Sequence, residues 1–201
     1  EGGVDVLYRF DAEGTRTALV LPASVRVEAL AFDAPRNEVV ALLRNRTNDE
    51  LSVQRYASST GAALNQSPVA SDCCSLRAGM STWSPQRRGF LVIGQRTGDA
   101  AVGVFGIGFD GSVQAFTAPA ADTVQALSVN TANGLIYALR HDPVSTTTTL
   151  HQVTLGGSNA GFTAIGAGES GCCFVLAGTG VIDGARMQVF AYPVGSVTPT
   201  L

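Results

Sequence analysis

The sequence contains no lysine, and it is poor in charge of either sign. All 13 basic residues are arginine, charged residues make up 14% of the chain, and the net charge is −3. The arginines are dispersed and form no basic stripe, so the sequence does not predict a nucleic-acid partner. No apolar run approaches the roughly 18–20 residues that cross a bilayer as a helix, so we expect no membrane span.

Helical patterning is missing as well. No window repeats apolar residues at positions i, i+3, i+4 and i+7, as an amphipathic helix would. Short apolar runs instead alternate with turn residues, and glycine is abundant at 23 residues. Hydrophobic residues make up 45% of the 201 residues, which is ample for a core. The sequence therefore predicts a single all-β domain over residues 1–201.

The strand pattern repeats along the chain. Residues 28–33 match residues 125–130, which lie 97 positions further on (125 minus 28). Residues 73–79 match residues 172–178 at a separation of 99 positions (172 minus 73). The chain therefore contains two similar halves of about 100 residues, each with two units of about 50, the length of one four-stranded propeller blade.

Four blades account for the whole length. We expect them at about residues 25–70, 71–119 and 120–168, with the fourth formed by residues 170–201 together with 1–24. The expected fold is a four-bladed β-propeller of about 16 antiparallel strands, whose last blade is closed by strands from the N- and C-termini. Such closure removes the exposed sheet edges that invite aggregation.

One dipeptide supports this arrangement of the ends. Phe10-Asp11 precedes Phe109-Asp110 by the same 99 positions that separate the matching parts of blades two and four. The N-terminal segment therefore carries the turn that the second half of the fourth blade requires.

The repeated motif is an apolar strand, a turn with Asp or Asn, and a strand rich in Val, Ile or Tyr. Residues 32–35 with 39–42, and residues 135–139, are examples. With this motif the chain resembles the broad superfamily of bacterial secreted β-propellers with YVTN- or WD40-like blades. The likeness covers nearly the whole chain but is generic, because the Gly-His…Trp-Asp signature is absent and Trp83 is the only tryptophan. The resemblance implies a propeller fold and a binding habit, and it implies no enzymatic activity.

The four cysteines form two doublets of adjacent residues, Cys73-Cys74 and Cys172-Cys173. Neighbouring residues on a strand point to opposite faces, so doublets suit a tetrahedral metal site poorly and we expect no metal. Each doublet could form a vicinal disulfide, the doublets could be linked across the propeller axis, or all four could be buried free thiols. Either disulfide arrangement predicts an extracytoplasmic location, secreted, periplasmic or at the cell surface.

Trp83, Arg87 and Arg88 are the candidate ligand-binding residues. They combine an aromatic ring with paired guanidinium groups in a predicted turn, and both residue types are favoured at binding hot spots. The alternative is that Trp83 fills the position held by Phe32 in the first blade.

None of the candidate catalytic or cofactor motifs in the sequence meets the chemical requirements of such a site. His141 and His151 are the only histidines, and the adjacent pair His141-Asp142 is not the spatial arrangement of a catalytic triad. The turn aspartates lack the spacing of a calcium loop. The glycines of residues 103–108 lie in a strand pattern, without the helix that a phosphate loop needs. We therefore expect no catalytic residue, metal site or cofactor.

These observations favour a non-enzymatic, extracytoplasmic binding or scaffold domain that presents loops around an axial channel to a protein or glycan ligand. Two alternatives stay open. One is a hydrolase or lyase with its site at the channel mouth, and the other is a haem- or metal-binding propeller that uses His141 or His151. The sequence does not indicate an oligomeric state.

Overall fold

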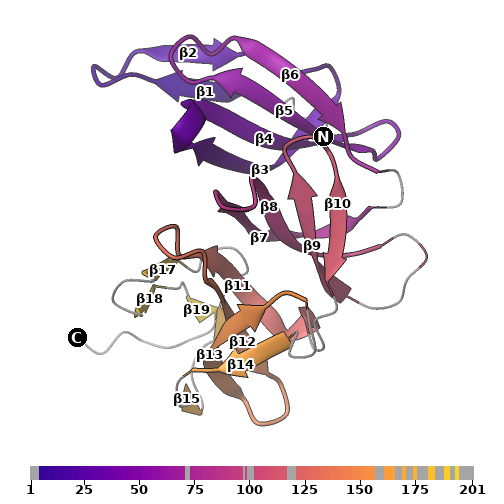
Figure 1. The fold of residues 1–201 in the computed structure, drawn as a ribbon, viewed down its shortest axis with the longest axis vertical. Helices are drawn as coiled ribbons and strands as arrows, with labels where there is room; N and C mark the ends of the chain where they lie inside the picture. The colour runs from indigo at the N-terminus through magenta and orange to yellow at the C-terminus, as the bar shows by residue number, and fades with distance from the viewer. Residues whose placement is uncertain are drawn as a thin grey trace. The chain divides into compact units, whose positions relative to one another are not determined.

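The computed structural model describes residues 5–70, 73–96, 98, 102–116, 121–156 and 161–165, and the backbone of five short strands beyond them. Every described element is a β-strand, apart from two single-turn 3-10 helices, η1 (Ala34–Arg36) and η2 (Ala121–Thr123) (Figure 1). The expected all-β fold is confirmed. Among these residues, no helix is long and apolar enough to cross a membrane.

Three antiparallel sheets of four or five strands make up most of the fold, and each follows chain order from strand to strand. The first sheet consists of β3 (Val25–Asp33), β4 (Glu38–Asn45), β5 (Leu51–Ala57) and β6 (Ala63–Pro68). The second consists of β7 (Ser75–Ser84), β8 (Gly89–Gln95), β9 (Val102–Gly108) and β10 (Val113–Phe116). The third consists of β11 (Val124–Val129), β12 (Ile136–Asp142), β13 (Thr147–Thr154) and β14 (Gly161–Ala164), with β15 (Glu169–Ser170) also paired to β13.

Three further strand pairs lie toward the ends of the chain. They are β1 (Leu7–Phe10) with β2 (Arg16–Leu19), β16 (Phe174–Val175) with β19 (Pro193–Val194), and β17 (Val181–Asp183) with β18 (Gln188–Phe190). Within the described strands, β1 and β2 pair only with each other. The expected pairing between the two ends of the chain is therefore not among the strand pairs described.

The separation of 99 positions recurs in the strand register. Ser84 of β7 faces Gly89 of β8, and Asp183 of β17 faces Gln188 of β18, 99 positions further on (183 minus 84). Every described pair of β17–β18 and of β16–β19 has such a counterpart in β7–β8. Hence β16 and β17 together correspond to β7, and β18 and β19 together correspond to β8.

The separation of 97 positions recurs as well. The register of β3 against β4 shifts at Glu28, and that of β11 against β12 shifts at Gln125, so the same bulge interrupts both sheets. The following turns each hold a residue with positive φ, Asp49 at 61° and Thr146 at 52°, again 97 positions apart. Bulges are specified features of a fold, so the duplication extends to backbone detail.

The described residues form two compact units, Glu1–Cys73 with Ile107–Val113, and Cys74–Gly106 with Gln114–Leu201. In the second unit, β11 lies against β7, and apolar side chains of the second and third sheets share one core, including Leu91, Ile93 and Leu127. In the first unit, Leu19 of the β1–β2 hairpin packs with Leu43 and Tyr56 of the first sheet. Each unit is therefore held by packing between sheet faces.

The β9–β10 turn makes a close approach that requires glycine. Gly111 has φ of 84°, and a Cβ atom there would overlap the carbonyl oxygen of Pro68. Gly14 in the β1–β2 turn has nearly the same φ, 82°, but a Cβ atom there would have nothing within 4 Å of it. The two glycines share a backbone conformation and differ only in surroundings.

We expect Gly111→Ala to destabilise the protein more than Gly14→Ala. Both substitutions place an L-residue in the left-handed region, at about 1–2 kcal/mol each. Gly111→Ala adds overpacking against Pro68, about 1–3 kcal/mol more. Urea unfolding of both variants measures the difference, and equal losses would show that the turn moves freely away from Pro68.

Candidate functional site

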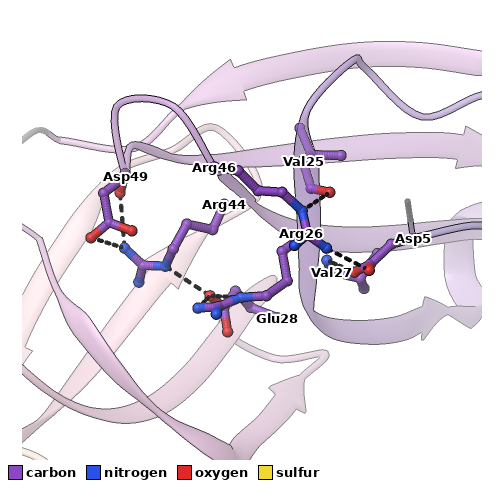
Figure 2. Close-up of polar contacts among 8 residues, drawn as sticks. All are labelled: Asp5, Val25, Arg26, Val27, Glu28, Arg44, Arg46 and Asp49. Carbon is purple, nitrogen blue, oxygen red and sulfur yellow. Dashed lines mark hydrogen bonds and ion pairs between the residues drawn. The ribbon is translucent and has the colours of Figure 1, made fainter. Parts of the chain in front are cut away.

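A network of ion pairs lies where β3 begins and β4 ends (Figure 2). Arg44 Nε lies 2.7 Å from Glu28 Oε1, and Arg26 Nη2 lies 2.6 Å from the same oxygen. Arg44 Nη1 also donates to the Asp49 carbonyl oxygen at 2.8 Å. The hydrogen bond to Glu28 and its negative charge raise the pKa of Arg26. The Arg44 and Glu28 side chains are only 7% and 10% exposed, so this pair is desolvated and depends on its own hydrogen bonds.

The same network fixes the N-terminal segment to the first sheet. Asp5 Oδ1 lies 2.8 Å from Arg46 Nη2, and Asp5 Oδ2 accepts the Val27 N–H at 2.7 Å (Figure 2). Arg46 Nε donates to the Val25 carbonyl oxygen at 3.1 Å. Each arginine of the network has a carboxylate partner, so the network is compensated internally. Its role is to hold the chain before β1 against the first sheet.

The equivalent positions of the third sheet hold neither the glutamate nor the arginine of this network. Gln125 stands where the first sheet has Glu28, and His141 stands where it has Arg44, each 97 positions later. Gln125 and His141 are buried, and His141 Nδ1 lies 3.0 Å from the hydroxyl of Thr148. The same bulge therefore forms in the third sheet without the ion pair of Glu28 and Arg44.

We expect Glu28→Gln to cost about 3 kcal/mol, because it leaves the buried Arg44 without the carboxylate at the bulge. The double variant Glu28→Gln with Arg44→His carries the residues of the third sheet and should recover most of that loss. Chemical unfolding of the two single variants and the double variant forms a thermodynamic cycle. Additive losses would contradict the pairing of these two side chains.

Trp83 is half-buried at the end of β7. Its ring meets that of Phe90 edge-on, with centroids 5.1 Å apart and planes at 72°. Trp83 faces Phe90 in the register as Phe32 faces Val39 in the first sheet, so the two positions are equivalent. Phe32 is nevertheless 53% exposed among the described residues. The ring of Trp83 thus contributes packing to the base of the turn.

Arg87 and Arg88 lie in the turn that follows. Arg87 is exposed, and its guanidinium carbon lies 5.3 Å from the ring centroid of Phe116. Arg88 has φ of 50°, while the equivalent turn positions of the first and third sheets are Asn37 and Gly134. Asn and Gly adopt this conformation readily, whereas for arginine it costs about 1 kcal/mol or more. The turn therefore holds an arginine in an unfavourable backbone conformation.

This turn adjoins the β11–β12 turn of the third sheet. Gln86 Nε2 donates to the Thr131 carbonyl oxygen at 2.8 Å, and Gly134 packs against the Gln86 side chain. Residues 85–88 and 131–134 therefore adjoin one another, and we call them together the turn surface. Trp83 lies just before it at the end of β7, and Arg87 is exposed on it.

Cys73 and Cys74 lie just before β7, are buried, and are disulfide-bonded, so the free-thiol alternative does not hold for these two. Gly94 packs against Cys74, and a Cβ atom at Gly94 would lie 2.8 Å from the Ser75 carbonyl oxygen. Cys172 and Cys173 lie outside the described residues. The pairing of the cysteines, vicinal or between doublets, stays a prediction.

The two histidines do not converge. His151 of β13 faces Ala138 of β12, and His141 lies three residues beyond Ala138, so alternation places the two rings on opposite faces of the third sheet. His151 Nδ1 is buried without a hydrogen-bond partner in the described structure. Burial, with the nearby positive charge of Arg140, lowers the pKa of His151. Within the residues described, no group of three or more His, Cys, Asp or Glu could hold a metal ion.

Two hollows in the first unit were not foreseen from the sequence. One, of about 280 Å³, is lined by polar side chains that include Glu50, Ser52 and Gln66. The other, of about 220 Å³, is mostly apolar and lies between the β1–β2 hairpin and the first sheet, where Leu7 and Leu30 contribute. Both depend on how the hairpin and the strand ends pack, which local sequence patterns do not reveal.

Comparison with known proteins shows likeness at the level of the fold. No protein-family model and no curated protein sequence matches this chain. A chain of a nidogen/laminin complex superposes with a TM-score of 0.58 at 11% identity, over 92% of this chain and 65% of that one. Prolyl oligopeptidase B from Galerina marginata, bound to a 35-residue hydrolysis and macrocyclization substrate, gives 0.51 at 9% identity, over 85% and 27%.

A third structure, from a structural and mechanistic study of two prolyl endopeptidases, gives a TM-score of 0.50 at 15% identity, over 94% of this chain and 31% of that one. The chain thus spans just under two thirds of the nidogen/laminin chain and less than a third of each of the other two. These likenesses establish a structural resemblance to β-propellers, without a sequence family.

Proposed function

We propose that the chain forms a four-bladed ring and that its fourth sheet is assembled from both ends, in the order β16/β17, β18/β19, β1, β2. The strand register supports the inner half, because these C-terminal pairs repeat β7–β8 at 99 positions. The turn chemistry supports the outer half. Asp11 accepts the Thr15 N–H on its carboxylate in the β1–β2 turn, and Asp110 accepts the Ser112 N–H in the β9–β10 turn.

Contacts within each unit support the flanks of that sheet. In the second unit β17 lies against β11, the first strand of the third sheet. In the first unit the β1–β2 hairpin packs on the first sheet, where Arg9 donates to the carbonyl oxygens of Ser58 and Ser59. A sheet made from both ends would thus have the third sheet on one side and the first on the other, as a closed ring requires.

The exposed part of the first sheet also supports a fourth sheet made from both ends of the chain. Leu30 and Phe32 of β3 share a face with Val39 and Ala41, which pack toward the hairpin, yet they are 51% and 53% exposed. The hairpin packs with the start of β3 at Val25 and leaves Leu30 and Phe32, further along the strand, more than half exposed. Two further strands added to the free edge of β1 would lie over Leu30 and Phe32.

The expected outcome is that Phe32→Ser and Leu30→Ser each destabilise the protein by about 2–4 kcal/mol, as buried apolar residues do. The control is Leu64→Ser on β6, which is 49% exposed and has no strand expected over it. It should change stability by no more than about 0.5 kcal/mol. Chemical unfolding measures all three, and losses as small as that of the control would rule out this closure.

For the ring as a whole, we propose a non-enzymatic, extracytoplasmic binding or scaffold domain whose ligand, a protein or a glycan, meets the turn surface. The observation that carries this is the turn itself, in which an exposed Arg87 stacks on the ring of Phe116 and stands beside Arg88, whose backbone conformation is strained. Strained backbone and Arg–aromatic clusters both concentrate at binding sites. The disulfide-bonded Cys73 and Cys74 support the extracytoplasmic location.

The nidogen/laminin structure is a complex of proteins, which is consistent with a protein-binding use of this fold. The prolyl oligopeptidase structures favour the alternative of a hydrolase, but this chain spans less than a third of each of those chains. A peptide-hydrolysis assay therefore accompanies the binding experiment.

The binding experiment screens the purified protein against a glycan array and a peptide array, with the double variant Arg87→Ser, Arg88→Gly as the comparison. We expect at least a tenfold loss of binding by the variant, with equal or higher thermal stability, because glycine relieves the strain at position 88. Binding that is unchanged in the variant would move the site away from the turn surface. Turnover of peptide substrates by the wild-type protein would overturn the non-enzymatic assignment.

A further inference from the structure

The third sheet carries a half-buried arginine that the repeated fold does not need. Arg140 of β12 faces Val124, and 97 positions earlier Leu43 of β4 faces Val27. Leu43 is fully buried in the core of the first unit. An apolar side chain therefore satisfies this position, and arginine there needs a separate explanation.

Arg140 has few partners. Its Nε donates to the Thr123 hydroxyl at 2.8 Å, and its guanidinium carbon lies 4.8 Å from the ring centroid of Phe162. No carboxylate of the described residues lies within ion-pair distance of it. Burial lowers the pKa of Arg140, and the more distant charges of Asp122 and Asp142 only partly offset that effect. The guanidinium is thus desolvated without the compensation that Arg44 receives.

Of the two nearby acids, Asp142 has its carboxylate engaged in its own turn, and Asp122 lies at the surface. Asp142 Oδ1 accepts the Val144 N–H at 2.8 Å, and Asp142 Oδ2 accepts the Ser145 hydroxyl at 2.9 Å. These hydrogen bonds lower the pKa of Asp142, so the carboxylate is held in its own turn. Asp122 is exposed, and its carbonyl oxygen accepts a hydrogen bond from Arg77.

His151 adds a second polar group to the same place. Thr149 faces Arg140 across β12 and β13, and His151 lies two residues further along, so Arg140 and His151 share one face. The rings of His151 and Phe162 meet edge-on with centroids 6.3 Å apart, and Arg140 covers the same Phe162 ring. His151 Nδ1 is buried without a partner in this part of the chain.

We propose that Arg140, together with Thr123 and His151, binds a carboxylate group of a ligand. The planar guanidinium matches a carboxylate with two parallel hydrogen bonds. The backbone of Phe162 already forms a hydrogen bond with the His151 ring, so it is the imidazolium form, with two donor nitrogens, that can donate from Nδ1 to the carboxylate. The site is distinct from the turn surface, because residues 131–134 precede β12 and Arg140 lies near its far end. The carboxylate belongs either to a small free acid or to an acidic residue of a larger ligand.

The test uses the full chain and two probes, sodium acetate and hexaglutamate, each compared with sodium chloride at equal ionic strength. The imidazole titration of His151 is followed by NMR. We expect a carboxylate at Arg140 to raise the pKa of His151 by about half a unit, since it brings negative charge beside the ring. A stronger effect of hexaglutamate than of acetate at equal carboxylate concentration would identify a larger acidic ligand, and equal effects would identify a small acid.

The variant Arg140→Leu restores the residue of the first sheet. It should abolish the response of His151 to both probes and raise the thermal unfolding midpoint without ligand, because it removes a desolvated charge. Arg16→Leu is the matched control, because Arg16 also stacks on an aromatic ring, that of Tyr8 at 4.5 Å, but is exposed. It should keep the response. An Arg140→Leu protein that still responds, or a wild-type protein that does not, overturns the site.

Discussion

The structure depends on covering the faces of twisted sheets that cannot stand alone. A four-stranded antiparallel sheet leaves an apolar face that must pack against a neighbour. In the second unit this need is met, since Ile93 of the second sheet and Leu127 of the third share a core. In the first unit it is met only in part, because the β1–β2 hairpin covers β4 and β5 but leaves Leu30 and Phe32 of β3 exposed. These two exposed side chains are the physical reason for our proposal that both ends of the chain form the fourth sheet.

The sequence reveals the parts of this fold that repeat, because a strand buried on both faces appears as a short continuous apolar run. Residues 39–42 and 136–139 are such runs and lie in β4 and β12, at equivalent places of their sheets. The irregular register of β7 between Leu76 and Ser81 was not foreseen, since extra residues in a strand change the pairing without changing local composition. The partnership of Glu28 with Arg44 was also missed, because it is created by the bulge and not by sequence proximity.

Charge varies at equivalent positions while the backbone does not. The bulge holds a buried ion pair in the first sheet and the buried side chains of Gln125 and His141 in the third. The register therefore does not depend on these charges. A half-buried charge indicates a ligand site only where no partner in the protein compensates it. The charge of Arg44 is compensated by Glu28, so we interpret Arg44 as a structural residue. Arg140 has no such carboxylate among the described residues, which is why it points to a ligand.

The second sheet has the disulfide-bonded cysteines at one end and the turn surface at the other. Cys74 immediately precedes β7 and is disulfide-bonded, whereas Arg87 and Arg88 follow its last residue. The seven residues of β8 opposite β7 extend roughly 23 Å, so the disulfide chemistry and the turn surface lie at opposite ends of the sheet. A turn held in one conformation loses less entropy when a ligand docks, which is what our proposal requires of the turn at Arg88. The equivalent turns fold with asparagine or glycine at this position, so an arginine held there in a left-handed conformation is better explained by what the turn contacts than by how it folds.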